Sequence, residues 1–132
     1  VKFLSTVAPH RNVVQLLGFV PSPYLCLVME YCEGGTLFRL ALRPTFLDNQ
    51  RLPALCQVAS ALHHVHSVGI VHRDLKTDNV LVATRVQDGA LPVVKLCDFG
   101  LGKRLEEGHL TDTPLLPSGF QAQRWHAPEL DA

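Results

Sequence analysis

The sequence predicts an α+β fold, in which strands and helices occupy separate stretches of the chain. Three observations support this prediction. Two aliphatic runs at residues 13–20 and 24–31 are separated by the turn-forming segment Pro21-Ser22-Pro23. A long stretch with helical spacing occupies residues 48–67. Two short β-branched runs follow it, and the remainder of the chain shows little periodicity.

At the N-terminus we expect a helix over residues 2–8, because its apolar side chains share one helical face and Pro9 ends the pattern. The strands at 13–20 and 24–31 should pair antiparallel across the short turn between them. The second of these strands is nearly continuous in apolar character, so we expect both of its faces to be buried.

Two helices are expected next. The first is short and runs from Thr36, which can cap it, to about Leu42. The second is the longest helix, with Asp48 as its N-cap, an end near Ser67 and Gly69 as its stop signal. Its apolar face is defined by side chains that recur at three-to-four spacing: Leu52, Leu55, Cys56, Ala59, Leu62, Val65 and His66.

The second half of the chain holds shorter elements. Strands are predicted at about residues 80–83 and 93–96, with a hairpin-like turn at Asp88-Gly89 between them. Residues 98–128 carry several glycines and prolines and are typical of a long loop, which we expect to order in an active state.

Composition narrows the setting of the protein. Lys plus Arg and Asp plus Glu both number 12 in 132 residues, so the net charge gives no support for a nucleic-acid or membrane-surface partner. No apolar run is long enough to span a bilayer. The four cysteines form no CxxC pair, which favours a reduced, cytoplasmic setting without a zinc site. Because the chain begins with Val1, we expect it to be a piece of something longer.

Three motifs carry the functional prediction. The stretch from His72 to Asn79 reads H-R-D-L-K-T-D-N and matches the catalytic-loop pattern H-R-D-L-x-x-x-N. Asp98-Phe99-Gly100 supplies D-F-G, and Ala127-Pro128-Glu129 supplies A-P-E. Any one tripeptide recurs by chance, but all three in this order and spacing are very specific. On these residues the chain resembles the eukaryotic protein kinase superfamily over essentially its whole length.

The resemblance implies a partial protein-kinase-like fold. We expect a single incomplete kinase domain over 1–132, comprising the end of the N-lobe sheet, the hinge and the first half of the helical C-lobe. Residues 1–31 would be the N-lobe remnant, and residues 32–132 would carry the hinge, catalytic loop and activation segment. The glycine-rich loop and the strand lysine of V-A-I-K are not in this sequence.

Catalytic roles follow from the resemblance and from the chemistry. Phosphoryl transfer spreads charge over the γ-phosphoryl oxygens, so such an enzyme works by positioning and by supplying positive charge. Asp74 would orient the substrate hydroxyl and accept its proton late. Lys76 would place an ammonium against the transferring phosphate, and Asn79 completes the expected catalytic set. Asn79 and Asp98 offer hard oxygen ligands for Mg²⁺, the expected metal.

An ATP pocket is implied in the same way. Met29 would limit access behind the adenine, and the backbone of Glu30 and Cys32 would bond the adenine edge. Leu37 and Leu81 would stack on the nucleotide ring.

Further positions acquire roles from the resemblance. Leu16, His72 and Phe99 would form a second apolar stack whose closure marks the active state. Arg73 would meet a phosphate on the activation loop. The candidate phosphorylation sites are Thr111, Thr113 and Ser118. Metal binding by the histidines at 63, 64 and 66 is disfavoured, because structural and surface roles explain them.

The expected activity is transfer of the ATP γ-phosphate to Ser or Thr hydroxyls of proteins. Lys76 resembles serine/threonine kinases, and Arg124-Trp125 resembles the tyrosine-kinase-like group. Ala122 stands where such kinases carry threonine, so Ser/Thr against Tyr stays open. We expect the full-length parent to be the enzyme and residues 1–132 alone to be inactive. The alternatives are a pseudokinase or scaffold, an inactive truncated product acting as a binding module, and, more distantly, a small-molecule kinase.

Overall fold

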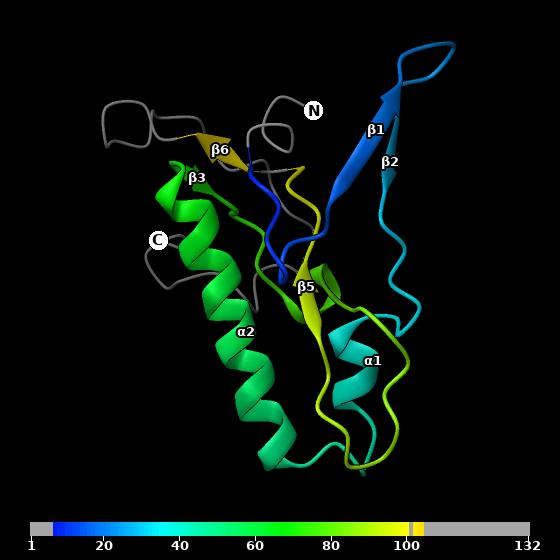
Figure 1. The fold of residues 1–132 in the computed structure, drawn as a ribbon, viewed down its shortest axis with the longest axis vertical. Coiled ribbons are helices and arrows are strands. Elements are labelled where there is room, and N and C mark those ends of the chain that lie inside the picture. The colour runs from blue at the N-terminus through cyan, green and yellow to red at the C-terminus, as the bar shows by residue number, and fades with distance from the viewer. Residues whose placement is uncertain (1–6, 101, 105–132) are drawn as a thin grey trace, which may run out of the picture.

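The computed structural model describes residues 7–100 and 102–104, and within them the predicted α+β arrangement is confirmed (Figure 1). The sheets in this part of the chain are two-stranded and antiparallel, pairing β1 with β2, β3 with β6 and β4 with β5. The elements are β1 (Leu16–Val20), β2 (Cys26–Met29), α1 (Leu37–Ala41), α2 (Asp48–Ser67), β3 (Ile70–Val71), a 3₁₀ turn (Thr77–Asn79), β4 (Val80–Val82), β5 (Val94–Leu96) and β6 (Lys103–Arg104).

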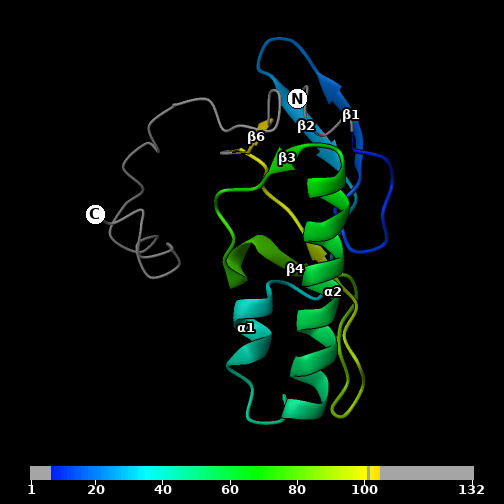
Figure 2. The same ribbon diagram turned by 90° about the vertical axis from the view of Figure 1, so that its left-hand side faces the viewer.

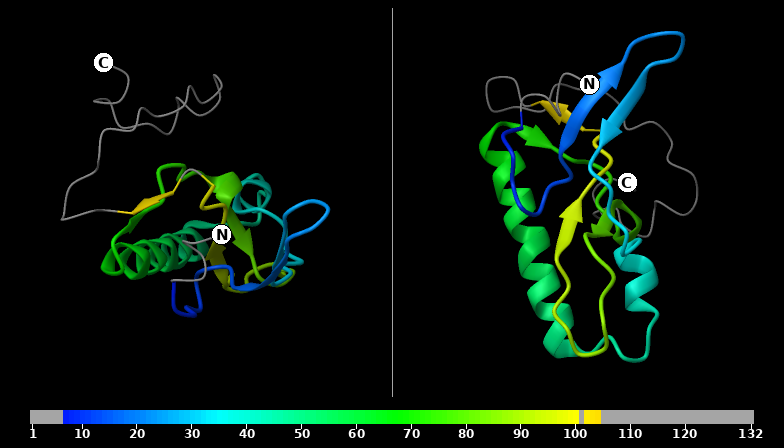
Figure 3. Two further views of the ribbon diagram at one scale, coloured as in Figure 1. Left: turned by 90° about the horizontal axis from the view of Figure 1, so that it is seen from above. Right: turned by 45° about the vertical axis from the view of Figure 1, so that its right-hand side comes forward.

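The β1–β2 hairpin confirms the predicted antiparallel pairing, with Leu16 opposite Met29 and Val20 opposite Cys26. Figures 1 and 3 show that it projects away from the helices. The first strand starts later than predicted because the preceding residues pair elsewhere. Val13 forms an isolated parallel bridge with Leu96, and the N–H of Val14 donates to the Leu96 carbonyl at 2.9 Å. This pairing ties the start of the hairpin to β5.

The predicted burial of the second strand is wrong. All residues of β2 are exposed, as are the flanking Tyr24 and Tyr31. The hairpin is a two-stranded ribbon, and no other described strand pairs with it. Within the described residues no further layer covers its aliphatic side chains, so they are exposed although they are apolar.

The two helices follow their capping signals closely. The Oγ1 of Thr36 accepts a hydrogen bond from the Arg39 N–H at 3.3 Å, as expected of an N-cap. Asp48, predicted to be the N-cap of α2, is instead its first residue, and Leu47 occupies the cap. The α2 helix ends as predicted, because Gly69 adopts a φ of 72° and its N–H bonds the His66 carbonyl at 2.9 Å.

The buried face of α2 matches the predicted one only in part. Val65 is fully buried and Leu62 packs against the core, as predicted. Leu52 and Leu55 are instead 65% and 60% exposed, and Ala61, outside the predicted face, is fully buried. Cys56, Ala59 and His66 are also exposed. The helix packs on β5 through small and amide-bearing side chains, which a search for apolar spacing overlooks. Figure 1 shows β5 alongside this helix, and Figure 2 shows the loop that precedes β5 running along it.

Buried amides join these elements. Gln57 of α2 accepts hydrogen bonds from the Val94 N–H at 3.0 Å and from Asn12 Nδ2 at 2.9 Å, and it donates to the Pro92 carbonyl at 2.9 Å. Asn12 also donates to the Val94 carbonyl at 2.8 Å. Gln50, only 2% exposed, donates to the Ala90 carbonyl. The network satisfies polar groups that the core would otherwise leave unpaired.

The β4–β5 hairpin lies within a residue of the predicted strands, and Gly89 turns the chain between them with a φ of 81°. Val82, Val94 and Leu96 are buried in the core. The pair of β3 and β6 was not predicted, because β6 is a two-residue strand inside the segment expected to be irregular. Residues 2–6 of the expected N-terminal helix and most of the expected long loop lie outside the described residues, and the last two positions of that helix, Val7 and Ala8, are not helical.

Candidate active site

The predicted catalytic loop lies between β3 and β4 and is anchored by His72, which is 2% exposed. The Asp74 N–H donates to Nδ1 of His72 at 3.2 Å. Because Nδ1 accepts, the ring proton is on Nε2, which donates to the Cys97 carbonyl at 2.8 Å. The ring also meets Phe99 edge-on, with centroids 4.8 Å apart. Burial lowers the pKa of His72 and favours this neutral form, despite the charge-stabilising Cys97 carbonyl.

Two predicted catalytic side chains, those of Lys76 and Asn79, converge on the carboxylate of the third, Asp74. Nζ of Lys76 lies 2.9 Å from Oδ2 of Asp74, and Nδ2 of Asn79 lies 2.8 Å from the same oxygen. Asn79 Nδ2 also donates to the backbone carbonyl of Asp74 at 2.8 Å. Asn79 is buried, while Asp74 and Lys76 are partly exposed. The carboxylate is thus held in place from two sides and still reaches solvent.

Asp98 is presented by an unusual backbone conformation. Its φ is 59°, and that of Arg73 in the catalytic loop is 62°, a region that residues other than glycine seldom adopt. Such strain persists where surrounding contacts enforce it, and it concentrates at functional sites. Here the Gly100 N–H donates to Oδ1 of Asp98 at 3.2 Å, and the Cys97 N–H bonds the Asn79 carbonyl at 2.9 Å.

The donor set fits a hard divalent cation. Asn79 uses its amide nitrogen on Asp74, which leaves Oδ1 as its metal-binding atom, and Asp98 adds a carboxylate. Mg²⁺ is typically held by one or two such protein oxygens together with water and phosphate. Residues 7–100 and 102–104 hold no group of three or more His, Cys, Asp or Glu that would suit a metal with more protein ligands.

A cavity of about 360 Å³ lies beside Asp98. Of the residues expected to bind the nucleotide, Met29, Glu30 and Leu81 line it, while Cys32 and Leu37 do not. Leu37 is instead part of the hydrophobic core. The full lining is Val14, Leu27, Met29, Glu30, Leu81, Cys97, Asp98, Phe99 and Gly100. The volume is in the range of small-molecule sites.

Cys97 directly precedes Asp98, which predicts that it flanks the nucleotide pocket, and it lines the cavity. Val14 is a lining residue that the sequence did not predict. Val14 reaches the cavity through its pairing with Leu96, which no local pattern announces. Burial raises the pKa of the Cys97 thiol to about 11, and the Asp98 charge adds to the effect. This thiol is therefore protonated and unreactive, as expected of a small apolar side chain.

Glu30 is fixed at the edge of this cavity. Its N–H donates to the Gln15 carbonyl at 3.0 Å, so only its carbonyl remains for an adenine edge. Its Oε1 accepts from the Gln15 N–H at 2.8 Å and from Nζ of Lys95 at 2.8 Å. Burial would raise the pKa of Glu30, but the bonds from Lys95 and Gln15 outweigh it and the pKa is lowered.

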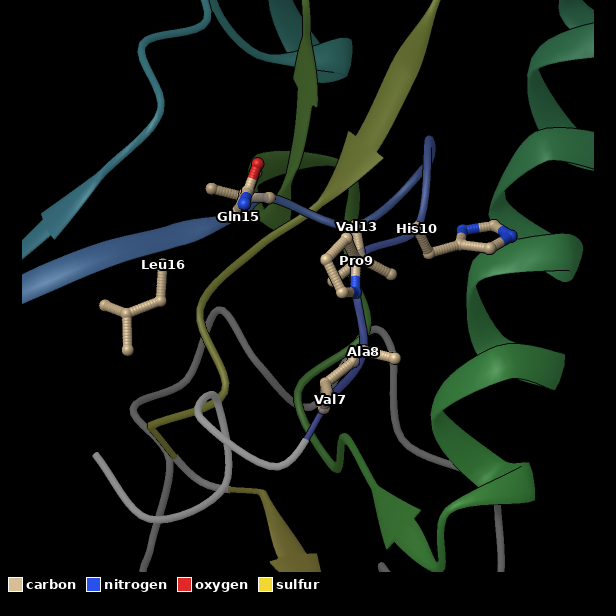
Figure 4. A pocket seen from close by; sticks show the side chains of 8 residues that line it. Val7, Ala8, Pro9, His10, Val13, Gln15 and Leu16 are labelled. Carbon is tan, nitrogen blue, oxygen red and sulfur yellow. The ribbon is translucent and has the colours of Figure 1, made fainter.

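A second, smaller cavity of about 130 Å³ lies beside the segment that enters β1 (Figure 4). Figure 4 shows His10 pointing from this segment toward α2, where it stacks on His64 with ring centroids 4.6 Å apart. Leu16, expected to join His72 and Phe99, lines this cavity. None of the motif residues lines it, although Val14 lines both cavities and the two therefore adjoin there. The lining is Val7, Ala8, Pro9, His10, Val13, Val14, Gln15 and Leu16.

Several predicted residues lie outside the described part of the chain. They are the candidate phosphorylation sites Thr111, Thr113 and Ser118, the departure at Ala122, the Arg124-Trp125 pair and the A-P-E motif.

Residues 1–130 match the Protein kinase domain family, so the chain belongs to the protein kinase family. It is 33% identical to the serine/threonine-protein kinase STE20 of Yarrowia lipolytica, covering 92% of this chain and 10% of that protein. It is 37% identical to human MAP kinase-activated protein kinase 5, covering 92% and 28%. Human ribosomal protein S6 kinase alpha-2 is 33% identical, with 92% and 17% covered.

The chain thus spans less than a third of the length of each of these relatives. Protein kinase domains generally use ATP and a divalent metal, which agrees with the donor set and cavity described above. Within the described residues, no helix combines the length and apolar character needed to cross a membrane.

Proposed function

We propose that the protein carrying this chain is a serine/threonine protein kinase that transfers the ATP γ-phosphate to a protein hydroxyl. The observation that carries the proposal is the convergence of Lys76 and Asn79 on the Asp74 carboxylate, within 2.9 Å and 2.8 Å. The similarity of this chain to the serine/threonine kinases named above supports a serine or threonine hydroxyl as the substrate group. The proposed catalytic set is Asp74, Lys76 and Asn79.

In this proposal Asp74 accepts a hydrogen bond from the substrate hydroxyl and aims its oxygen at the γ-phosphorus. A carboxylate is too weak a base to deprotonate an alcohol outright, so the proton transfers late and orientation is its main contribution. Lys76 moves its ammonium from Asp74 toward the transferring phosphoryl oxygens, where negative charge must be balanced. Asn79 holds the Asp74 side chain and backbone in a fixed relative position during the reaction through its two hydrogen bonds.

Asn79 and Asp98 are the residues that would hold magnesium. When bound, Mg²⁺ supplies positive charge to the β- and γ-phosphate oxygens. The strained backbone at Asp98 fixes where its carboxylate enters the cavity. The adenine would occupy the apolar end of the same cavity, between Leu81 and the β2 residues Leu27 and Met29.

The setting of the enzyme is part of the proposal. We infer a protein substrate from membership of the kinase family. The balanced charge favours no nucleic-acid partner, and the cysteine pattern favours a cytoplasmic location, either of the protein itself or of the cytosolic part of a larger protein. Division of the chain into an N-lobe remnant over 1–31 and a hinge-to-activation segment over 32–132 stays a prediction. Membership of the tyrosine-kinase-like group also stays a prediction, because it depends on Arg124-Trp125 outside the described residues.

The test is phosphotransfer by the full-length protein with magnesium, comparing wild type with Asp98→Ala. Asp78→Ala is the matched control, because Asp78 is an exposed carboxylate within the same catalytic loop. We expect the Asp98 variant to lose activity and the Asp78 variant to keep it. ATP binding by the wild type without transfer would favour the pseudokinase alternative. Equal activity in all three would attribute the transfer to a contaminating enzyme and overturn the proposal.

A further inference from the structure

The ion pair between Lys95 and Glu30 joins two walls of the candidate nucleotide cavity. Nζ of Lys95 lies 2.8 Å from Oε1 of Glu30, and the side chains are only 16% and 27% exposed. Glu30 follows directly on β2, and Lys95 is the central residue of β5. Their positions in the sequence are 65 apart. The pair therefore connects β2, which leads into the segment between β2 and α1 (residues 30–36, here called the hinge), with β5, which leads to Asp98.

The face on which Lys95 lies follows from the strand register. Lys95 is opposite Leu81 in the β4–β5 pair, and directly opposed residues share one face of a sheet. Leu81 lines the cavity, whereas Val94 and Leu96 point to the other face and are buried in the core. The Lys95 side chain thus rises from the cavity side of the hairpin toward the hinge.

Glu30 receives this bond on an oxygen that already has a backbone partner. Its Oε1 accepts the Gln15 N–H at 2.8 Å, and its own N–H donates to the Gln15 carbonyl at 3.0 Å. Further along the hinge, the Gly34 N–H donates to the Val82 carbonyl at 3.0 Å, so backbone bonds attach that end to β4. At the Glu30 end, the Lys95 side chain attaches the hinge to β5 through the ion pair.

We propose that Lys95 is a positioning residue for the nucleotide, because its ion pair with Glu30 holds the hinge at a fixed distance from Leu81 and Cys97 on the opposite wall. This inference rests on the proposed kinase function. Without the ammonium, the Glu30 carboxylate keeps only the Gln15 N–H and is drawn toward solvent, which pulls the adjoining backbone with it. The catalytic loop is held by separate contacts around Asp74, so the chemistry itself is unaffected.

The test is steady-state kinetics of the full-length protein with Mg·ATP, comparing wild type with Lys95→Met, which keeps the stem and removes the charge. We expect the KM for ATP and the Kd for ADP to rise about tenfold, the scale set by one hydrogen bond to a charged group. The value of kcat should change by less than about twofold. Lys95→Arg, which restores a cation, should recover most of the affinity.

Arg51→Met is the matched control, because Arg51 pairs with Asp48 at 3.3 Å on the surface, with side chains 51% and 96% exposed. It should leave KM, Kd and kcat unchanged. A Lys95→Met enzyme with wild-type KM and Kd would overturn the inference, and so would a fall in kcat and thermal stability without a change in affinity. Wild-type protein that transfers no phosphate would instead count against the proposed function, so the two failures are distinct.

Discussion

Asn79 donates two hydrogen bonds to Asp74 from a single amide nitrogen, one to Oδ2 and one to the backbone carbonyl, each 2.8 Å long. The side chain that is expected to bind metal therefore also fixes the side chain that is expected to orient the substrate. The two roles are coupled, because a movement of Asn79 displaces the Asp74 carboxylate that it holds.

Replacement of Asn79 by Ala should accordingly lower both activity and stability. We expect kcat to fall at least about a hundredfold, since a ligand and an orienting contact are lost together. The free energy of unfolding should fall by about 1–2 kcal/mol, the usual contribution of such hydrogen bonds. Kinetics and urea unfolding measure the two effects. Asp78→Ala, at the exposed neighbouring position, is the control and should change neither.

Asp74→Asn should separate chemistry from nucleotide binding. The amide keeps the shape of the side chain but cannot accept the substrate proton, so we expect kcat to fall about a hundredfold or more. Asp74 does not line the cavity, so the Kd for ADP should stay within about twofold of wild type. Calorimetric titration with ADP and Mg²⁺ gives the second quantity. A large loss of ADP affinity would show that the two sites are not separate.

Gly34 marks a close approach between the hinge and β4. A Cβ at this position would come within 2.7 Å of the Val82 side chain and would also meet the Thr84 carbonyl. Because the obstacle includes backbone, the strand must shift to admit it. We expect Gly34→Ala to lower the free energy of unfolding by about 1–3 kcal/mol, measured by chemical denaturation. Gly18→Ala is the control, since nothing lies within 4 Å of its Cβ position, and a comparable loss there would contradict the steric explanation.

The grouping of Asp74, Lys76 and Asn79 could be predicted from the sequence, because these residues are close together in the chain. The groups that converge on Asp74 lie on one short segment between β3 and β4, and phosphoryl transfer restricts which residue types can serve there. The antiparallel pairing of the β1–β2 hairpin and the strand positions of the β4–β5 hairpin were likewise predictable, since turn residues and β-branched runs are local signals.

The cavity walls and the buried face of α2 could not be predicted in the same way. Val14 lines the cavity because its backbone pairs with Leu96, a contact between distant parts of the chain. The face of α2 is set by Gln50 and Gln57, whose amides bond the backbone of β5 and of the segment before it. A polar residue counts against burial in any apolar pattern, although here its hydrogen bonds make burial favourable.

We expect the domain to lose stability as the pH decreases through a window set by the pKa of His72. Burial lowers the pKa of His72 in the folded protein, so between that value and the unfolded value of about 6.5 only the unfolded chain takes up the proton. Stability is therefore complete above about pH 6.5 and is lost as the pH falls below it. Thermal unfolding between about pH 7.5 and 5.5 measures the slope.

His72→Asn should reduce this slope, because its side chain can still accept the Asp74 N–H but does not titrate. The slope should not vanish, since the pKa of His10 is also lowered, by burial and by the neighbouring His64. His63→Asn, at an exposed position, is the control and should keep the wild-type slope. An unchanged slope in the His72 variant would show that the lost stability has another source.

Gln57→Leu tests the buried amide network, because leucine has a similar volume but no polar atoms. The change removes Oε1 of Gln57, which accepts from the Val94 N–H and from one N–H of the Asn12 amide. Val94 is fully buried, so water cannot replace the lost acceptor there. Each buried unsatisfied group costs about 1–3 kcal/mol, so the free energy of unfolding should fall by about 2–4 kcal/mol even though apolar area is gained. Gln87→Leu makes the same chemical change at an exposed loop position and should be nearly neutral. If Gln57→Leu were as stable as wild type, the amide contacts would not be what sets the buried face of α2, and helical propensity or apolar packing would have to account for it.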